Sequence, residues 1–388
     1  MTRLALTGVQ VFDGERIRDG EAVIVSDDRI EAVVPETSLE PEIERHDLAQ
    51  GLLAPGFIDV QVNGGGGALF NNDPSPDAIR RIAEAHRRFG TTGLLPTVIT
   101  DAPEIMRAAA DAVNLARCER MPGILGIHFE GPFLDSRRRG AHDERFIRAM
   151  TAADIAYFHG LDCGTLLITL APSRVEPEMV AALVTAGIIV SLGHAEATAD
   201  EAFAALRAGA RGFTHLYNAM SQLGHRAPGM VGAALADRDS YCSLIADGHH
   251  VDPLALKVAL AAKPTGKLYL ISDAMPTAAG GPKHFKLQGR EVRVKEGRLE
   301  LANGTLAGSN LTMDEAVRYC CSTLEIAREE ALRMASLYPA RFLGLDHELG
   351  RIARGYRADL VHLSDDLHVL GTWIDGMPQP AMHPTTAS

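Results

Sequence analysis

The chain has 388 residues, of which 46% are hydrophobic and 23% are charged, and its formal net charge is −12. This composition is typical of a globular protein and excludes a mainly disordered or fibrous chain. The negative charge argues against a general nucleic-acid binder or a protein that adheres to anionic membranes, although a small anionic substrate could still enter a locally basic pocket. No apolar run is long enough to span a membrane, and the first residues lack the apolar core of a signal peptide.

The cysteines are odd in number and form no Cys-x-x-Cys pair, which favours small buried thiols in a reducing cytoplasm over disulfides or a metal centre. They are Cys118, Cys163, Cys242, Cys320 and Cys321.

Both ends of the chain are predicted to form short β-strands separated by turns. Apolar residues that alternate with polar ones, or that run continuously, lie between Asp-Gly and Asp-Asp turns, which is typical of strands. These segments are 5–12, 21–26 and 29–35 at the first end and 350–364 and 367–379 at the second. Neither end alone can bury two sheet faces. We therefore expect residues 1–51 and 345–388 to build one small β-sandwich domain together.

Between the two ends, apolar runs alternate with stretches of helical periodicity. The runs lie at 56–62, 93–99, 123–129, 165–171, 187–193, 212–216, 242–248 and 268–274. Helices are predicted at 76–90, 103–120, 176–187, 199–210 and 252–263. Continuous apolar strands alternating with helices indicate a parallel sheet, and eight repeats favour a (β/α)8 barrel over residues 52–344.

One segment interrupts this alternation after the eighth run. Residues 285–305, with the sequence FKLQGREVRVKEGRLELANGT, are predicted to form a β-hairpin or excursion, and residues 335–344 a closing helix.

Several of the predicted strands end in polar residues, and in a barrel these ends meet at one rim. Glu130, His194 and His215 would supply one carboxylate and two imidazoles there, which is a suitable set for a hydrolytic metal ion. Asp273 follows the eighth strand directly and could accept a proton from water and pass it to the leaving group.

These residues lie in motifs that together resemble one family over nearly the whole chain. The motifs are PGFIDVQVNGGGG, HFEGPF, GAH, SLGHAEAT, FTHLYNAM, ADGHHVDP, ISDAM and GTLAGSNLTM, followed by ASLYPARFLG and LGRIARGYRADLV. In this order they resemble the N-acetylglucosamine-6-phosphate deacetylase family of the amidohydrolase superfamily.

The resemblance implies roles for the matching residues. Glu130, His194 and His215 would bind the metal, Asp273 would act as general base and then acid, and His142 would hydrogen-bond the acetyl carbonyl. The sugar phosphate would be contacted by Ala141, His142, Asn218, Ala219, His250, Leu306, Ala307 and Gly308. Arg226 would meet the phosphate through bidentate pairing of its guanidinium, either within its own chain or from the partner subunit of a homodimer.

The first predicted barrel strand, at 56–62, differs from the corresponding strand of the wider superfamily. Many members of that superfamily carry His-x-His in this strand and bind two metals. Gln61 and Asn63 stand there instead, and neutral amides are poor ligands for transition metals. We therefore expect one divalent ion per chain, zinc being the first choice and iron, cobalt or manganese the alternatives. Gly64–Gly67 is interpreted as a tight turn and Arg137–Arg139 as a solvated loop, while His225 and His249 receive no role.

The leading hypothesis is a metal-dependent cytoplasmic enzyme that releases acetate from N-acetyl-D-glucosamine 6-phosphate in amino-sugar metabolism. The same reaction on N-acetylgalactosamine 6-phosphate is the nearest alternative, because the two sugars differ at one hydroxyl group. An N-acyl-amino-acid deacylase and a non-catalytic scaffold are more distant alternatives.

Overall fold

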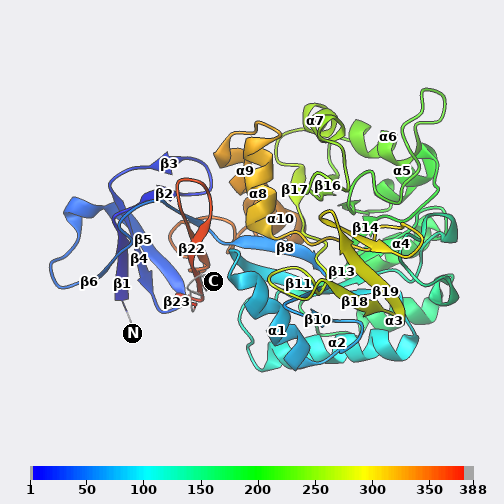
Figure 1. Cartoon of the computed structure of the whole chain (residues 1–388), viewed down its shortest axis with the longest axis horizontal. Helices are drawn as coiled ribbons and strands as arrows, with labels where there is room; N and C mark the ends of the chain where they lie inside the picture. Colours follow the sequence, from blue (N-terminus) through cyan, green and yellow to red (C-terminus); the bar gives the residue numbers. More distant parts are fainter. Residues whose placement is uncertain (1–2, 380–388) are drawn as a thin grey trace.

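A computed structural model describes residues 3–379 and shows two parts, a small β-domain and a larger barrel (Figure 1). Both ends of the chain lie in the small domain. Its two sheets have the strand orders β5-β4-β1-β6 and β23-β22-β21-β7-β2-β3. The strands are β1 (Arg3–Thr7), β2 (Gln10–Phe12), β3 (Ile17–Arg18), β4 (Glu21–Ser26), β5 (Arg29–Pro35), β6 (Glu44–Asp47), β7 (Leu52–Pro55), β21 (Leu360–Leu363), β22 (Val369–Ile374) and β23 (Met377–Pro378).

The two ends share one core, as the sequence pattern predicts. Leu6 and Val23 from the first end pack in the same cluster as Leu360 and Trp373 from the second. Burying these apolar faces against each other is what the separate ends could not achieve. The six-stranded sheet includes β7 and so reaches Pro55, four residues past the predicted boundary at 51. Residues 380–388 of the predicted second segment lie outside the described residues.

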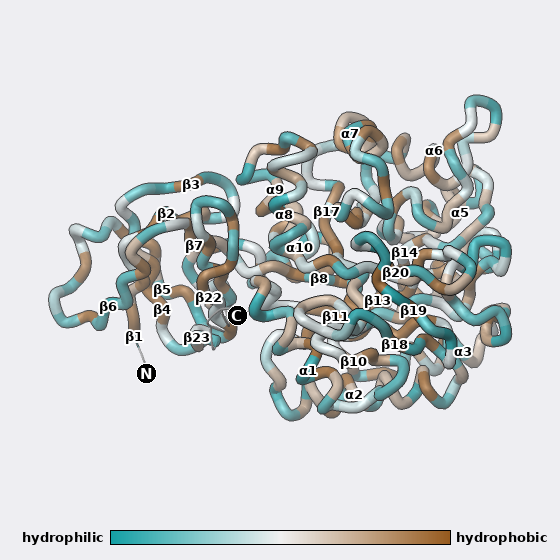
Figure 2. Tube along the Cα trace, viewed as in Figure 1, coloured by the Kyte–Doolittle hydropathy of each residue, from teal (hydrophilic) through white to brown (hydrophobic). Residues whose placement is uncertain are grey.

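All eight predicted apolar runs form strands of one parallel sheet, in the order β17-β16-β15-β14-β13-β12-β11-β8. A parallel bridge between Val62 and Ala274 joins its two edges and closes the barrel. The strands are β8 (Phe57–Val62), β11 (Thr91–Ile99), β12 (Gly126–Glu130), β13 (Thr165–Leu170), β14 (Ile189–Leu192), β15 (Gly212–Phe213), β16 (Tyr241–Leu244) and β17 (Leu268–Leu270). Hydrophobic residues concentrate along these strands and those of the sandwich (Figure 2).

The helices surround the barrel and bury one face each. Ser75 caps α1 by accepting the amide of Ala78, and Thr198 and Glu201 form a capping box at α5. The predicted helices correspond to α1 (Pro76–Arg87), α2 (Pro103–Cys118), α4 (Pro177–Thr185), α5 (Ala199–Arg207), α7 (Pro253–Ala262) and α10 (Leu337–Leu343). The predicted elements did not include α3 (Ala152–His159), α6 (Gly229–Ala236), α8 (Met313–Ser322) and α9 (Arg328–Ala335).

The predicted excursion is a three-stranded antiparallel sheet, which we call the cover sheet: β18 (His284–Leu287), β19 (Arg290–Lys295) and β20 (Arg298–Leu301). Two-residue strands β9 (Gly64–Gly65) and β10 (Ala68–Leu69) form a separate hairpin after β8. Leu287, Val292 and Leu299 of the cover sheet form a small core with Ile99 and Met275, which come directly from barrel strand ends. This core fixes the cover sheet to the rim of the barrel.

Within residues 3–379, no helix is both long and apolar enough to cross a bilayer. All five cysteines are free.

Candidate metal and catalytic site

Glu130, His194 and His215 converge at the C-terminal rim of the barrel, as the strand pattern predicts. The Nε2 atoms of the two histidines are 3.0 Å apart, and they lie 3.1 Å and 2.9 Å from Glu130 Oε1. All three side chains are buried. Three potential ligand atoms therefore point at one small volume.

The backbone at this rim is held in an unusual conformation. His194, His215 and Asp273 have φ values of 47°, 37° and 51°, in the left-handed region that residues with a Cβ seldom adopt. Each of them lies two or three residues past the end of a barrel strand. The surrounding barrel therefore imposes a backbone geometry that aims these side chains inward.

Hydrogen bonding orients the metal-facing nitrogen of His194. Its Nδ1 lies 2.9 Å from the carbonyl oxygen of Arg138, which can only accept a hydrogen bond, so Nδ1 carries the proton. Nε2 is then the ring nitrogen that faces Glu130 and His215. Burial would raise the pKa of Glu130, but the hydrogen bonds from His194 and His215 hold that pKa well below its usual value. The carboxylate is therefore charged.

This donor set fits a divalent ion. One carboxylate and two imidazoles, with room for water, are the chemistry that zinc and its neighbours accept in hydrolytic sites. Without a cation, two buried imidazole nitrogens face each other at 3.0 Å, an arrangement that a shared positive ion would stabilise. The residues present are compatible with a metal ion, and its chemical identity is left to the proposal below.

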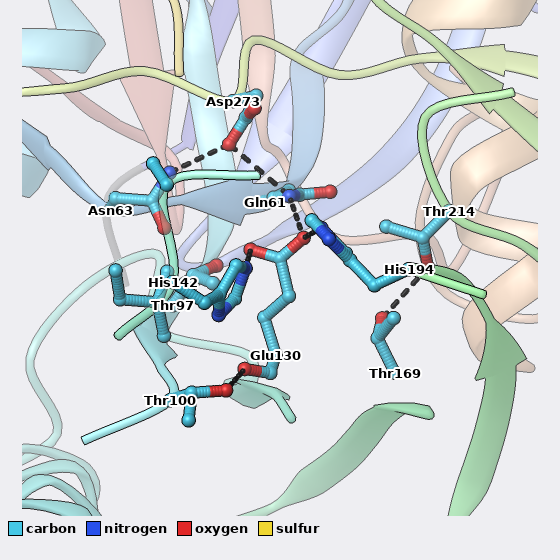
Figure 3. Close-up of polar contacts among 12 residues, drawn as sticks. Gln61, Asn63, Thr97, Thr100, Glu130, His142, Thr169, His194, Thr214 and Asp273 are labelled. Carbon is cyan, nitrogen blue, oxygen red and sulfur yellow. Dashed lines mark hydrogen bonds and ion pairs between the residues drawn. The ribbon is translucent and has the colours of Figure 1, made fainter. Parts of the chain in front are cut away.

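Gln61 and Asn63 hold the general-base candidate in place (Figure 3). Gln61 Nε2 donates to Glu130 Oε1 at 3.0 Å and to Asp273 Oδ1 at 3.1 Å, and Asn63 Nδ2 donates to the same Asp273 oxygen at 2.7 Å. Among the described residues, Asp273 Oδ2 receives no hydrogen bond and is left for proton transfer. Burial, and then the charge of Glu130, raise the pKa of Asp273.

His142 lies against the same cluster. Its ring is 4.4 Å from that of His194 between centroids, and its Nε2 is 3.8 Å from Glu130 Oε2. Burial, and then the positive charge that His194 can carry, lower the pKa of His142 to about 3, so the ring is neutral at physiological pH. A neutral imidazole can donate one hydrogen bond to a carbonyl oxygen without itself losing a charge.

A cavity of about 420 Å³ opens above these groups and has room for a sugar phosphate. Most of the predicted site residues line it: Glu130, Ala141, His142, His194, His215, Asn218, Ala219, His250, Asp273, Leu306 and Gly308. Ala307 is fully buried in the core beneath the cover sheet and is not part of the wall. Arg226 does not line the cavity either and lies exposed on the loop before α6.

Two arginines of the cavity wall and one acid that hydrogen-bonds a wall residue were not among the predicted site residues. Arg137 and Arg138 line the cavity, whereas the sequence favours a solvated loop for Arg137–Arg139. The loop is held at the cavity because the Arg138 carbonyl oxygen accepts a hydrogen bond from His194 and the Arg138 side chain pairs with Glu196. Asp247 accepts a 2.6 Å hydrogen bond from His250 Nδ1. Spacing could have revealed this second pair, since the acid stands three residues before the histidine.

Gln61 and Asn63 occupy the place where a second metal ion would need ligands. Both amides donate through their nitrogen atoms to carboxylates, and a neutral amide oxygen is a poor ligand for a transition-metal ion. We predict one tightly bound divalent ion per chain, measured by elemental analysis after exhaustive dialysis. Two tightly bound ions per chain would contradict this assignment.

The barrel, the buried Glu-His-His set and the acid on the last strand together define an amidohydrolase. The chain matches the amidohydrolase family over residues 52–378 and the NagA composite domain over residues 4–52. It therefore belongs to the amidohydrolase superfamily and, within it, to the N-acetylglucosamine-6-phosphate deacetylase family, as the following relatives show.

An N-acetylgalactosamine-6-phosphate deacetylase of Shewanella sp. (strain ANA-3) is 44% identical, over 96% of this chain and 95% of its own. An N-acetylglucosamine-6-phosphate deacetylase of Haemophilus influenzae is 36% identical, over 92% and 93%. The crystal structure of N-acetylglucosamine-6-phosphate deacetylase from Pasteurella multocida superposes with a TM-score of 0.95 at 35% identity, covering 98% of this chain and 100% of that chain. The predicted fold and family are confirmed.

Proposed function

We propose that this enzyme hydrolyses the acetamide group of N-acetyl-D-glucosamine 6-phosphate, giving D-glucosamine 6-phosphate and acetate. The observation that carries the proposal is the buried Glu130–His194–His215 set beside Asp273, in a cavity that is also lined by His250. Relatives with this activity cover almost the whole chain. The intact site argues against a non-catalytic scaffold.

The metal-ligand candidates, Asp273 and His142 have separate roles in the reaction. A divalent ion held by Glu130, His194 and His215, with zinc as the first choice, would polarise the acetyl carbonyl and lower the pKa of a nearby water. Asp273 Oδ2 takes the proton of the attacking water and returns it to the departing amine, which leaves poorly unless protonated. Neutral His142 donates to the acetyl oxygen as negative charge develops on it.

His250 supports the phosphate part of the substrate. Burial alone would lower the pKa of His250, but the hydrogen bond and the negative charge of Asp247 raise it above its ordinary value. The ring of His250 lies in the cavity wall, where its protonated form would attract an anion strongly. Arg137 and Arg138 lie in the same wall, where Arg137 pairs with Asp135 and Arg138 with Glu196.

We further propose a homodimer in which Arg226 reaches the site of the partner subunit. Arg226 makes no hydrogen bond or ion pair within residues 3–379, and the segment before α6 protrudes from the barrel near the top right of Figure 1. Leu223 on that segment and Leu254 and Val258 on α7 are 56%, 74% and 53% exposed. Exposed apolar side chains and an arginine without a partner among the described residues suit a contact between two copies.

Replacing Arg226 by Ala is expected to raise KM for the phosphorylated sugar with little effect on unphosphorylated N-acetylglucosamine. Losing a charge-assisted pair costs about 1.5–3 kcal/mol, so KM should rise by about 10- to 150-fold. Steady-state kinetics on both sugars measure the difference. Equal effects on the two sugars would remove Arg226 from the phosphate site.

The contact across subunits has its own test. Chains with Arg226→Ala and chains with Asp273→Asn should regain activity when mixed, if each dimer then contains one site with both native residues. Size-exclusion chromatography with light scattering determines the oligomeric state of the same samples. A monomer, or no recovery on mixing of exchanging dimers, contradicts the proposed reach of Arg226.

N-acetylgalactosamine 6-phosphate is the second candidate substrate, favoured by the 44% identical relative that acts on this sugar by name. An acetate-release assay with both 6-phosphates and with an N-acetyl amino acid tests the assignment. A higher kcat/KM for the gluco sugar supports the leading proposal, and a higher value for the galacto sugar replaces it.

The location is proposed on a different observation. The five free cysteines support a reducing, cytoplasmic location.

A further inference from the structure

Arg290 connects the cover sheet to the loop that carries His142. Its Nη2 donates to the carbonyl oxygen of Ala141 at 2.5 Å and to Gln288 Oε1 at 3.1 Å. Ala141 immediately precedes His142 and also packs against the small core beneath the cover sheet. The backbone next to His142 is thus attached to the cover sheet by both a charged hydrogen bond and an apolar contact.

Gln288 links the same connection to the barrel. Its Nε2 donates to the carbonyl oxygen of Thr100 at 2.8 Å, and Thr100 in turn donates through its amide and its hydroxyl to the carbonyl oxygen of Glu130. A continuous path of hydrogen bonds therefore runs from the backbone of a metal-ligand candidate to the backbone beside His142. Arg290 itself is not part of the cavity wall.

We propose that Arg290, braced by Gln288, is a positioning residue that holds His142 over the reacting carbonyl. This rests on the proposed function, because it assigns His142 the acetyl oxygen. His142 Nδ1 is buried and has no hydrogen-bond partner within the described residues, so no hydrogen bond at Nδ1 orients the ring. The ring packs against His194, and the backbone that carries it is constrained by the guanidinium at Ala141.

A donor that must meet developing charge loses much of its effect when it is displaced by a fraction of an ångström to an ångström. Removing the guanidinium should therefore lower kcat more than it raises KM. The phosphate and sugar contacts do not involve Arg290, and neither do the metal ligands. Metal content should stay at the wild-type value.

The decisive experiment is a double-mutant cycle between Arg290→Ala and His142→Ala, read as kcat for acetate release from N-acetylglucosamine 6-phosphate. We expect Arg290→Ala alone to lower kcat by about 10- to 100-fold, with KM changed less than about threefold. In the His142→Ala background the same substitution should have almost no further effect, because it acts through that ring. Arg290→Lys should recover part of kcat.

Arg293→Ala is the matched control, since Arg293 lies on the same strand, is 70% exposed and bonds only Glu291. It should behave as wild type. If Arg290→Ala lowers the melting temperature strongly, Gln288→Ala provides the second variant: it keeps the guanidinium, removes its brace and should lower kcat in the same direction.

Three results would overturn the proposal. The first is unchanged kcat in folded Arg290→Ala, and the second is a loss of kcat on Arg290→Ala that is undiminished in the His142→Ala background. The third, for the case in which Arg290→Ala is unstable, is unchanged kcat in both Gln288→Ala and Arg290→Lys. Wild-type protein that releases no acetate from either hexosamine 6-phosphate would instead contradict the proposed function. The two failures are therefore distinguishable.

Discussion

Asp273→Asn is expected to lower kcat by about 10²- to 10⁴-fold, which is the usual contribution of a general acid–base group. The amide keeps the shape of the side chain but cannot accept a proton. The oxygen atom of the new amide would still accept the hydrogen bonds that Gln61 and Asn63 donate to Oδ1 of the carboxylate in the native protein. KM should stay within a few-fold, because Asp273 is assigned to proton transfer and not to sugar binding.

The pH profile gives this prediction a second measurement. Since burial and the charge of Glu130 raise the pKa of Asp273, the base form is present above that raised pKa and is lost as the pH falls through it. Wild-type kcat should therefore fall on the acidic side, and this limb should flatten in the residual activity of the variant. Near-normal kcat with the metal retained would show that Asp273 is not the base, and His142 would be the next candidate.

His194→Ala should remove both the metal ion and the activity, while the fold survives. Loss of residues that merely support a ligand weakens metal binding by about 10- to 100-fold, so loss of a ligand itself should exceed that range. The Gly193 to Ala195 backbone remains bonded to neighbouring strand ends, which keeps the barrel closed. Elemental analysis and acetate release measure the two losses on one sample.

Thermal unfolding separates loss of metal from loss of structure. A ligand that binds only the folded state raises its melting temperature, so added zinc should stabilise the metal-stripped wild type and leave His194→Ala almost unchanged. His347→Ala is the control, because this histidine is exposed and follows helix α10, and the variant should retain metal and activity. A His194→Ala protein that keeps its ion at wild-type content would remove this residue from the metal site.

The sequence alone was sufficient for the barrel, the shared sandwich and the cluster of Glu130, His194, His215 and Asp273. Continuous apolar strands of a parallel sheet and the helices between them leave a local periodic signal, and the carboxyl ends of such strands must meet at one rim. The resemblance to a family added His142 and the substrate contacts. Helix α6, in contrast, is short and buried on nearly all sides, so it lacks the polar–apolar periodicity by which a surface helix is found in a sequence.

Only the tertiary structure decided which side chains act together across the barrel. Gln61 lies 69 residues from Glu130 and 212 from Asp273 in the chain, yet its amide bridges the two carboxylates. The Arg290–Ala141 contact spans 149 residues and depends on how the cover sheet packs on the rim. Hydrogen bonds between side chains so far apart leave no periodic trace in a single sequence, because they follow from the closure of the barrel and the folding of the cover sheet over its rim.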